Sequence, residues 1–299
     1  MTRGPEDGVV VAQRPTFKHR LEFAGLGLVF LMGRTLPRQF FVRLGAALGR
    51  FVHDGLKIRR EVTRDNLRHA LPNLPEDEIV ALARRSYGQL GGSLLEFASL
   101  PGMDHDELIR CVRFENLEAI DRVRARGQGA MLVTAHFGSW ELFGASFVAR
   151  GYPTTFFVKR QKNPLVADLQ DDIRRRAGIE IVTEGPAVAK GVLRALRNGH
   201  LVGILPDQDA RRHGVWVEFL GRPASTFKGP AFFAYRAGVP IIPAYVRRQA
   251  DGNHVGVILD PIEPDLSRDQ DEEVFRLTQA YTDLMTAWIV KHPEHYFWV

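Results

Sequence analysis

A histidine and a glutamate follow a short apolar run in the middle of the chain, with four residues between them. The two are His136 and Glu141, at the end of the stretch that starts at Gly129. An imidazole that binds a carboxylate through one ring nitrogen can act as a general base through the other. We therefore predict that His136 removes a proton from a substrate and that Glu141 orients its ring. The alternative is a packing histidine beside a glutamate that is there only for the helix dipole.

The elements around this pair would place it at the mouth of a turn. The apolar run at 131–134 predicts a buried strand. Ser139 is a suitable N-cap for a helix that continues to residue 149. His136 then lies between strand and helix, and Glu141 lies in the first helical turn. The nearby helix N-terminus favours negative charge, such as that of an oxyanion.

Polar residues also follow two other predicted strands, at 154–159 and 201–205. Ligands of open α/β sheets bind at the carboxyl ends of the strands, so we expect these residues to share a site with His136. The candidate substrate-binding residues are Lys159, Arg160, Asn163, Asp207, Asp209 and, before a predicted helix at 229–237, Lys228. Each has an alternative. The basic loop at 159–164 could be a solvated turn, the two aspartates could cap a helix or form ion pairs, and Lys228 could be a surface residue.

The pattern of the chain divides it into three parts. Residues 1–20 are expected to form a flexible tail and residues 21–100 a helical region. Beyond residue 101, strands alternate with helices, which is typical of an α/β layer. We predict further strands at 179–183, 216–219, 241–246 and 255–259, and helices at 168–177, 187–197 and 272–291. The α/β core is therefore expected to span residues 101–299.

An uncharged apolar run at 23–33 is flanked by Lys18, Arg20, Arg34 and Arg38. It is too short to cross a bilayer, which takes about 20 apolar residues. We predict a helix that lies on or dips into an anionic membrane surface. The alternative is a buried core helix that Pro37 ends.

The composition narrows the possible functions. With 299 residues, 45% of them hydrophobic and 25% charged, the chain is that of an ordinary globular protein. Its net charge of +5 suits an anionic partner: nucleic acid, anionic lipid or an acidic carrier protein. The single Cys111 excludes disulfides within the chain and thiolate metal clusters. We find no nucleotide-binding loop, nucleophile elbow or zinc-protease spacing, and expect neither a metal nor a cofactor.

The stretch from His136 to Glu141 resembles the His-x4-Glu signature of the bacterial lipid A late acyltransferases, the lauroyl/myristoyl transferases. This family belongs to a wider lysophospholipid acyltransferase group. Further blocks similar to those of the family occur in the family's order over nearly the whole chain: Asn163–Pro164, Asp207–Asp209, Phe219–Ala224, Thr226 with Gly229–Ala231, Gly238–Pro243 and Pro293–Trp298.

The resemblance implies a mixed, mostly parallel sheet flanked by helices, as in glycerolipid acyltransferases, with an N-terminal membrane-associating region. It implies transfer of an acyl group from an acyl carrier protein or coenzyme A thioester to a glycolipid hydroxyl. In that reaction His136 would be the general base, Glu141 its partner, and Lys159 or Arg160 a candidate oxyanion ligand. The protein would act at the cytoplasmic face of the inner membrane, bound peripherally or by one N-terminal anchor.

Other functions stay open at this point. The acceptor could be a phosphatidylinositol mannoside, an ornithine lipid or a lysophospholipid, because pocket shape decides that choice. A non-catalytic lipid-binding protein on the same scaffold is a further alternative. We expect no nucleic-acid partner, since the charge is modest and no recognition motif is present.

Overall fold

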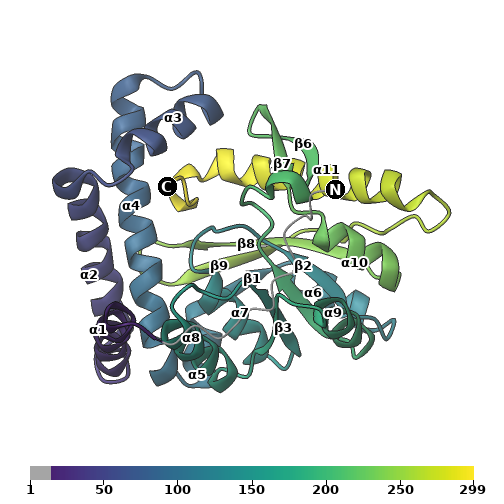
Figure 1. Ribbon diagram of the computed structural model, residues 1–299, viewed down its shortest axis with the longest axis horizontal. Coiled ribbons are helices and arrows are strands. Elements are labelled where there is room, and N and C mark those ends of the chain that lie inside the picture. The colour runs from purple at the N-terminus through teal and green to yellow at the C-terminus, as the bar shows by residue number, and fades with distance from the viewer. Residues whose placement is uncertain (1–14) are drawn as a thin grey trace, which may run out of the picture.

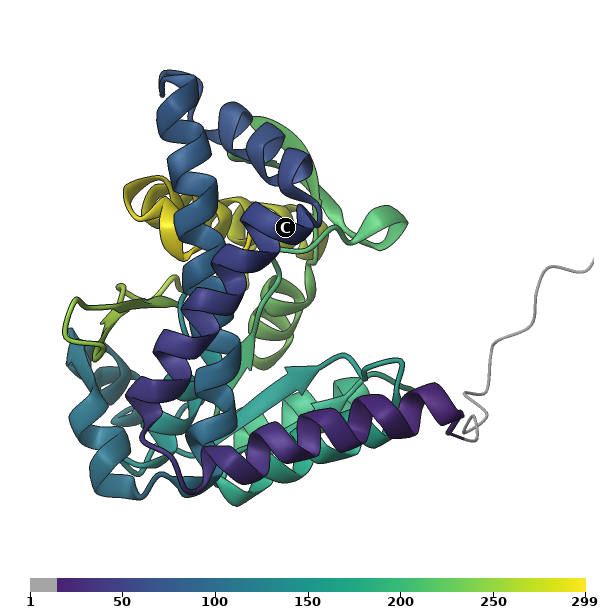
Figure 2. The ribbon, with the colours of Figure 1, turned by 90° about the vertical axis from the view of Figure 1, so that its left-hand side faces the viewer.

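The computed structural model describes residues 15–299. The predicted tail therefore lies mostly outside the described residues, and its last four residues, 17–20, are helical instead. The N-terminal helices are α1 (Phe17–Gly33), α2 (Arg38–Phe51), α3 (Arg60–Ala70) and α4 (Glu76–Ser99), with a π-helical turn at Val52–Leu56. Figure 2 shows α2 running beside α4, with α1 lying across their ends.

The remaining chain alternates strands and helices around a seven-stranded sheet (Figure 1). Its helices are α5 (His105–Cys111), α6 (Glu118–Arg124), α7 (Trp140–Val148), α8 (Pro164–Arg176), α9 (Val188–Arg197), α10 (Gly229–Ala237) and α11 (Gln270–Lys291). Its strands are β1 (Val112–Glu115), β2 (Ala130–Val133), β3 (Thr154–Val158), β4 (Glu180–Thr183), β5 (Leu201–Ile204), β8 (Ile241–Arg248) and β9 (His254–Ile258). Strands β6 (Val215–Phe219) and β7 (Arg222–Thr226) form a separate antiparallel hairpin.

The strand order is β1-β9-β8-β2-β5-β3-β4. Neighbours are parallel except β8 and β9, which are antiparallel. The predicted mostly parallel sheet with flanking helices is therefore confirmed. Short strand β1 and hairpin strand β7 were not predicted, and neither were helices α5 and α6.

Two hydrophobic clusters cover the two faces of the sheet. Met131 and Val133 of β2 point into one cluster, while Ala130 and Leu132 point into the other, as the two-residue period of a strand requires. Helices α9, α10 and α11 cover the first face, and α5 to α8 cover the second. The long helix α4 contributes to both clusters, so it ties the N-terminal helices to the sheet.

Helices α2 and α4 pack closely because glycines line their contact. A Cβ added at Gly45 would lie 2.2 Å from the carbonyl oxygen of Gly91, and one at Gly49 would lie 2.0 Å from that of Tyr87. Buried Glu96 of α4 also binds Arg38 of α2 at 2.5 Å and Arg248 of β8 at 3.0 Å. Backbone approach and a buried ion network therefore fix α2 and α4 against the end of β8.

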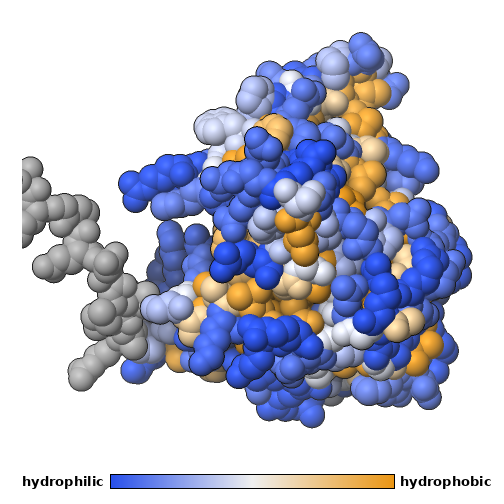
Figure 3. All heavy atoms as spheres, turned by 90° about the vertical axis from the view of Figure 1, so that its right-hand side faces the viewer, coloured by the Kyte–Doolittle hydropathy of each residue, from blue (hydrophilic) through white to orange (hydrophobic). Residues whose placement is uncertain are grey.

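The N-terminal helices leave much apolar surface uncovered. In α1 only Phe30 and Gly33 are buried, while Leu28 and Leu31 are 59% and 60% exposed. Within residues 15–299, no helix combines the length and apolar character that crossing a bilayer would need. The side of the molecule away from α1 and α2 also has an apolar area, bordered by hydrophilic residues (Figure 3). The predicted membrane association of α1 is thus not shown by the fold itself.

Candidate functional site

The predicted strand-to-helix turn is present, and the C-terminal segment holds it in place. Gly138 has a φ of +59°, and a Cβ there would lie 2.0 Å from the carbonyl oxygen of Val246. Glycine therefore suits the position both for its backbone angle and for space. The N–H of Gly138 donates to the carbonyl of His295, and the N–H of Phe297 donates to the carbonyl of His136.

The carboxylate that binds His136 is that of Asp207. Asp207 follows β5, which lies directly beside β2 in the sheet. Its Oδ1 is 2.8 Å from Nδ1 of His136, and its Oδ2 accepts the backbone N–H of His136 at 2.9 Å. The Asp207 side chain is only 2% exposed, whereas that of His136 is 22% exposed. No protein group among residues 15–299 hydrogen-bonds Nε2, so this nitrogen can serve a substrate.

The carboxylate also sets the basicity of the ring. Burial alone would lower the pKa of His136, but the charge of Asp207 and its hydrogen bond outweigh burial and raise that pKa above its ordinary value. Glu141 adds a smaller attraction in the same direction. A carboxylate at Nδ1 fixes the tautomer and leaves Nε2 as the basic nitrogen.

The predicted contact between Glu141 and His136 is wrong. Glu141 instead binds Arg174 of α8 through two hydrogen bonds, of 2.5 Å to Oε1 and 3.0 Å to Oε2. Arg174 also lies 3.3 Å from Asp171. Both members of the Glu141–Arg174 pair are largely buried, with 11% and 13% of their side chains exposed. Glu141 therefore connects the start of α7 to α8.

The basic loop follows β3, two strands away from β2 at the same edge of the sheet. Lys159 and Arg160 are exposed, and Arg160 pairs with Asp168 at 2.5 Å. Asn163 was expected to bind substrate, but its amide is used inside the protein. Its Oδ1 caps α8 by accepting the N–H of Leu165, and its Nδ2 donates to Glu22. The expectation for Asn163 is therefore corrected to a structural role that attaches α1 to α8.

The two remaining candidate substrate-binding residues, Asp209 and Lys228, lie at the surface. Asp209 is exposed and accepts the backbone N–H of Arg211, and Lys228 is exposed at the start of α10. The structure brings neither of them into contact with His136. Phe137 of the turn and Phe143 of α7 are 0% and 1% exposed and belong to the core.

The C-terminal residues Tyr296 and Phe297 were not predicted to surround His136, and Asp207 was expected there only as a substrate ligand. Phe297 and Trp140 lie with ring centroids 6.0 Å and 5.2 Å from the imidazole. Tyr296 pairs with Phe137 in an isolated bridge. The block at 293–298 was seen to resemble the family, but only the fold reveals that it packs against the turn. The signal for Asp207 was available: an aspartate at the end of a strand that could adjoin β2.

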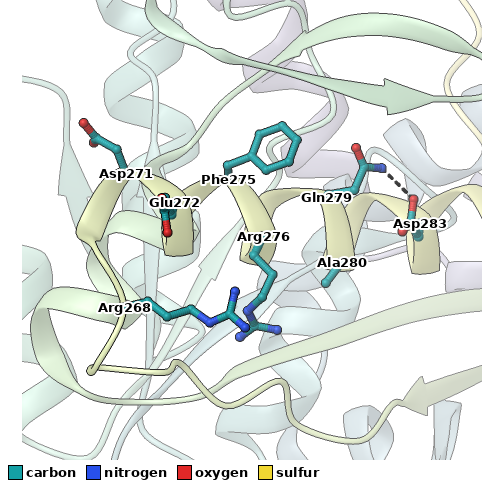
Figure 4. A pocket seen from close by; sticks show the side chains of 8 residues that line it. All are labelled: Arg268, Asp271, Glu272, Phe275, Arg276, Gln279, Ala280 and Asp283. Carbon is teal, nitrogen blue, oxygen red and sulfur yellow. Dashed lines mark hydrogen bonds between the residues drawn. The ribbon is translucent and has the colours of Figure 1, made fainter.

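A hollow of about 810 Å³ lies elsewhere, along the outer side of α11. Figure 4 shows Phe275 on one side of this helix and the guanidinium groups of Arg268 and Arg276 on the other. None of the residues expected to do chemistry lines it. Within residues 15–299 there is also no group of three or more side chains placed to hold a metal ion. The strand ends of β2 and β5 therefore remain the candidate site.

Comparison with known families shows which family the chain belongs to. The model of the family described as "Bacterial lipid A biosynthesis acyltransferase" matches residues 13–299. The chain belongs to this family. Its members transfer acyl groups, and the chain is accordingly an O-acyltransferase.

Individual acyltransferases support the assignment at low identity. The lipid A biosynthesis lauroyltransferase of Escherichia coli strain K12 is 27% identical over 94% of this chain and 90% of its own length. The palmitoleoyltransferase of the same organism is 23% identical over the same shares. The phosphatidylinositol mannoside acyltransferase of Mycobacterium tuberculosis strain CDC 1551 is 29% identical over 78% of this chain and 73% of its own length.

Proposed function

We propose that this acyltransferase moves a fatty acyl group from a thioester of acyl carrier protein or coenzyme A to a hydroxyl of a membrane glycolipid such as a lipid A precursor. The observation that carries the proposal is the His136–Asp207 pair, at 2.8 Å, with no hydrogen bond from residues 15–299 to Nε2. A histidine held in this way is suited to deprotonating an alcohol. The names of the relatives suggest the class of acceptor.

The reaction needs only one base. Nε2 of His136 takes the proton of the acceptor hydroxyl while the oxygen attacks the thioester carbonyl carbon, and Asp207 stabilises the imidazolium that forms. The tetrahedral intermediate then collapses, the carbon–sulfur bond breaks, and the imidazolium returns the proton to the thiolate. No acyl-enzyme intermediate forms, so the protein needs no nucleophile of its own.

Charged groups near the strand ends would assist this reaction. The developing oxyanion requires a hydrogen-bond donor or a cation, and the N-terminus of α7, Lys159 and Arg160 are the candidates. Asp209 and Lys228 are candidates for contacts with the acceptor's sugar or phosphate groups. Glu141 acts by fixing α7 to α8 through Arg174 and by its smaller attraction for the imidazolium.

We also propose that α1 and α2 bind a membrane surface, at the cytoplasmic face of the inner membrane where the family's acceptor is expected. Exposed apolar residues recur along both helices, including Leu28 and Leu31 in α1 and Leu48 and Phe51 in α2. Basic side chains accompany them at Lys18, Arg20 and Arg34. Such a mixture favours peripheral binding to anionic lipid.

The experiment is incubation of the protein with acyl carrier protein thioesters or acyl-coenzyme A and candidate acceptors, followed by mass spectrometry of the lipids. An acyl-lipid product of the added mass supports the proposal and identifies both donor and acceptor. A phosphatidylinositol mannoside is the second candidate acceptor, because the mycobacterial relative is 29% identical. If an ornithine lipid or a lysophospholipid is acylated instead, that lipid is the acceptor and the lipid A precursor is not. Binding of lipids without any transfer would support the non-catalytic alternative.

A further inference from the structure

A groove rich in arginine lies between α2 and α4, outside the site described above. Its volume is about 360 Å³. Four arginines line it, from three different elements: Arg50 of α2, Arg84 and Arg85 of α4, and Arg248 of β8. Glu294 is the one acidic residue in the lining. The groove is therefore strongly cationic.

Not all of this charge is neutralised within the protein. Arg248 binds Glu96 at 3.0 Å, and Arg84 binds Asp54 at 2.8 Å. Arg50 and Arg85, by contrast, have no ion-pair partner in the part of the chain that the structure describes. Two guanidinium groups are thus available to an anion from outside. Guanidinium groups bind phosphate oxygens in a bidentate manner and are preferred for that task.

Three small residues beside the arginines leave room in the groove for such a group. Gly88, Gly92 and Ala46 all contribute to it. A Cβ added at Gly88 would lie 3.3 Å from Nη1 of Arg50, and one at Gly92 would lie 3.8 Å from Nη2 of Arg248. Larger residues would occupy the space beside the guanidinium groups.

The position of the groove indicates where the anion comes from. Helix α2, which supplies Arg50, also carries the exposed apolar residues Leu44, Leu48 and Phe51. One helix therefore offers an apolar surface for acyl chains and a cationic groove for a head group. We propose that the groove binds the phosphate group of an anionic membrane phospholipid. The proposal rests on the membrane association of α2 and is independent of the transfer reaction.

The test measures sedimentation of the full chain with vesicles of phosphatidylcholine, with and without phosphatidylglycerol. The wild-type protein should bind the anionic vesicles more tightly. The Arg50→Lys/Arg85→Lys variant keeps both charges but loses the bidentate geometry, so it should lose about fivefold or more of that gain. Arg43→Lys is the matched control, because Arg43 is exposed on the same helix and does not line the groove. It should keep the gain.

A second variant tests the space inside the groove. Ala46→Phe would fill the groove without changing any charge, and it should also lose the gain while its circular dichroism spectrum stays that of the wild type. An equal loss in Arg43→Lys, or no gain in the wild type, would overturn the proposal. Groove variants that keep the gain but lose affinity for acyl carrier protein would also overturn it. If the groove variants bind vesicles of pure phosphatidylcholine as the wild type does, the association of α1 and α2 with the membrane does not depend on the groove.

Discussion

The imidazole Nδ1 of His136 lies 2.8 Å from Oδ1 of Asp207, and the other oxygen of that carboxylate accepts the backbone N–H of His136 at 2.9 Å. Both bonds join neighbouring strands of the sheet, because His136 follows β2 and Asp207 follows β5. The carboxylate thus fixes the ring and the backbone that carries it. This relationship is the basis of the proposed chemistry, and the predictions on Asp207, pH and His136 depend on it.

Replacing the carboxylate should remove most of the catalytic power. Asp207→Asn keeps the size of the side chain but allows the wrong tautomer of His136, so kcat should fall by about 10²- to 10⁴-fold. KM should change little, because Asp207 is buried beneath the imidazole. Steady-state kinetics would measure both. Asp260→Asn is the control, since Asp260 also follows a strand but is exposed; an equal loss there would contradict the account.

The dependence of activity on pH follows from the raised pKa of His136. A general base must be neutral, so kcat/KM should be constant at high pH and fall as pH drops below that pKa. Since Asp207 raises the pKa above the ordinary 6.5, the fall should begin above pH 6.5 in the wild type. In Asp207→Asn the midpoint should move to lower pH. A midpoint that stays in place would mean that Asp207 does not set the basicity of the ring.

Glu141 and Arg174 should behave as one unit in folding. Removing either partner leaves the other largely buried without its main ion pair, so Glu141→Ala and Arg174→Ala should each cost about 2 kcal/mol or more of unfolding free energy. The double variant should cost much less than the sum of the two, with a coupling of about 1–3 kcal/mol. Urea denaturation of the four proteins gives these values. Additive losses would show that the pair contributes nothing as a pair.

The sequence singled out His136 as the candidate base but did not predict which carboxylate binds its ring. The spacing of His136 and Glu141 suggested a local pair, because a carboxylate in the first helical turn can reach back to the preceding loop. The positive φ of Gly138 and the arrival of Arg174 from α8 decide otherwise, and a charge pair between distant segments has no signature in spacing. Asp207 was predicted to be near His136, since both follow strands, but the order of those strands could not be read.

The fold was predictable where periodicity is strong. Strands β2, β3, β4 and β5 and helices α7, α8 and α9 were found because short apolar runs alternate there with stretches of helical period. Strand β1 contains the charged residues Arg113 and Glu115, and β7 contains Pro223, so neither has the apolar run that marks β2 and β5. The contact of Asn163 with Glu22 depends on where α1 docks, which no local pattern specifies.

The apolar surface of α2 should contribute to membrane binding. Leu48 and Phe51 are 48% and 59% exposed, and their replacement together by serine removes apolar area that lipid would cover. Affinity for phosphatidylcholine vesicles should fall about tenfold or more. Phe275→Ser on α11 is the matched control, with Phe275 also 48% exposed (Figure 4). Vesicle sedimentation measures both affinities. A comparable loss in the α11 variant would show that the position of the apolar residues on α2 does not matter.

Acyl transfer by His136→Ala is the most direct test of the central claim. The measurement is the rate at which acylated lipid appears by mass spectrometry, with the variant at the same concentration as the wild type and its circular dichroism spectrum and vesicle binding unchanged. We predict that the rate falls to the level without enzyme, because Nε2 of His136 is the base that takes the proton of the acceptor hydroxyl in the proposed reaction. A variant that retained most of the wild-type rate would contradict the account.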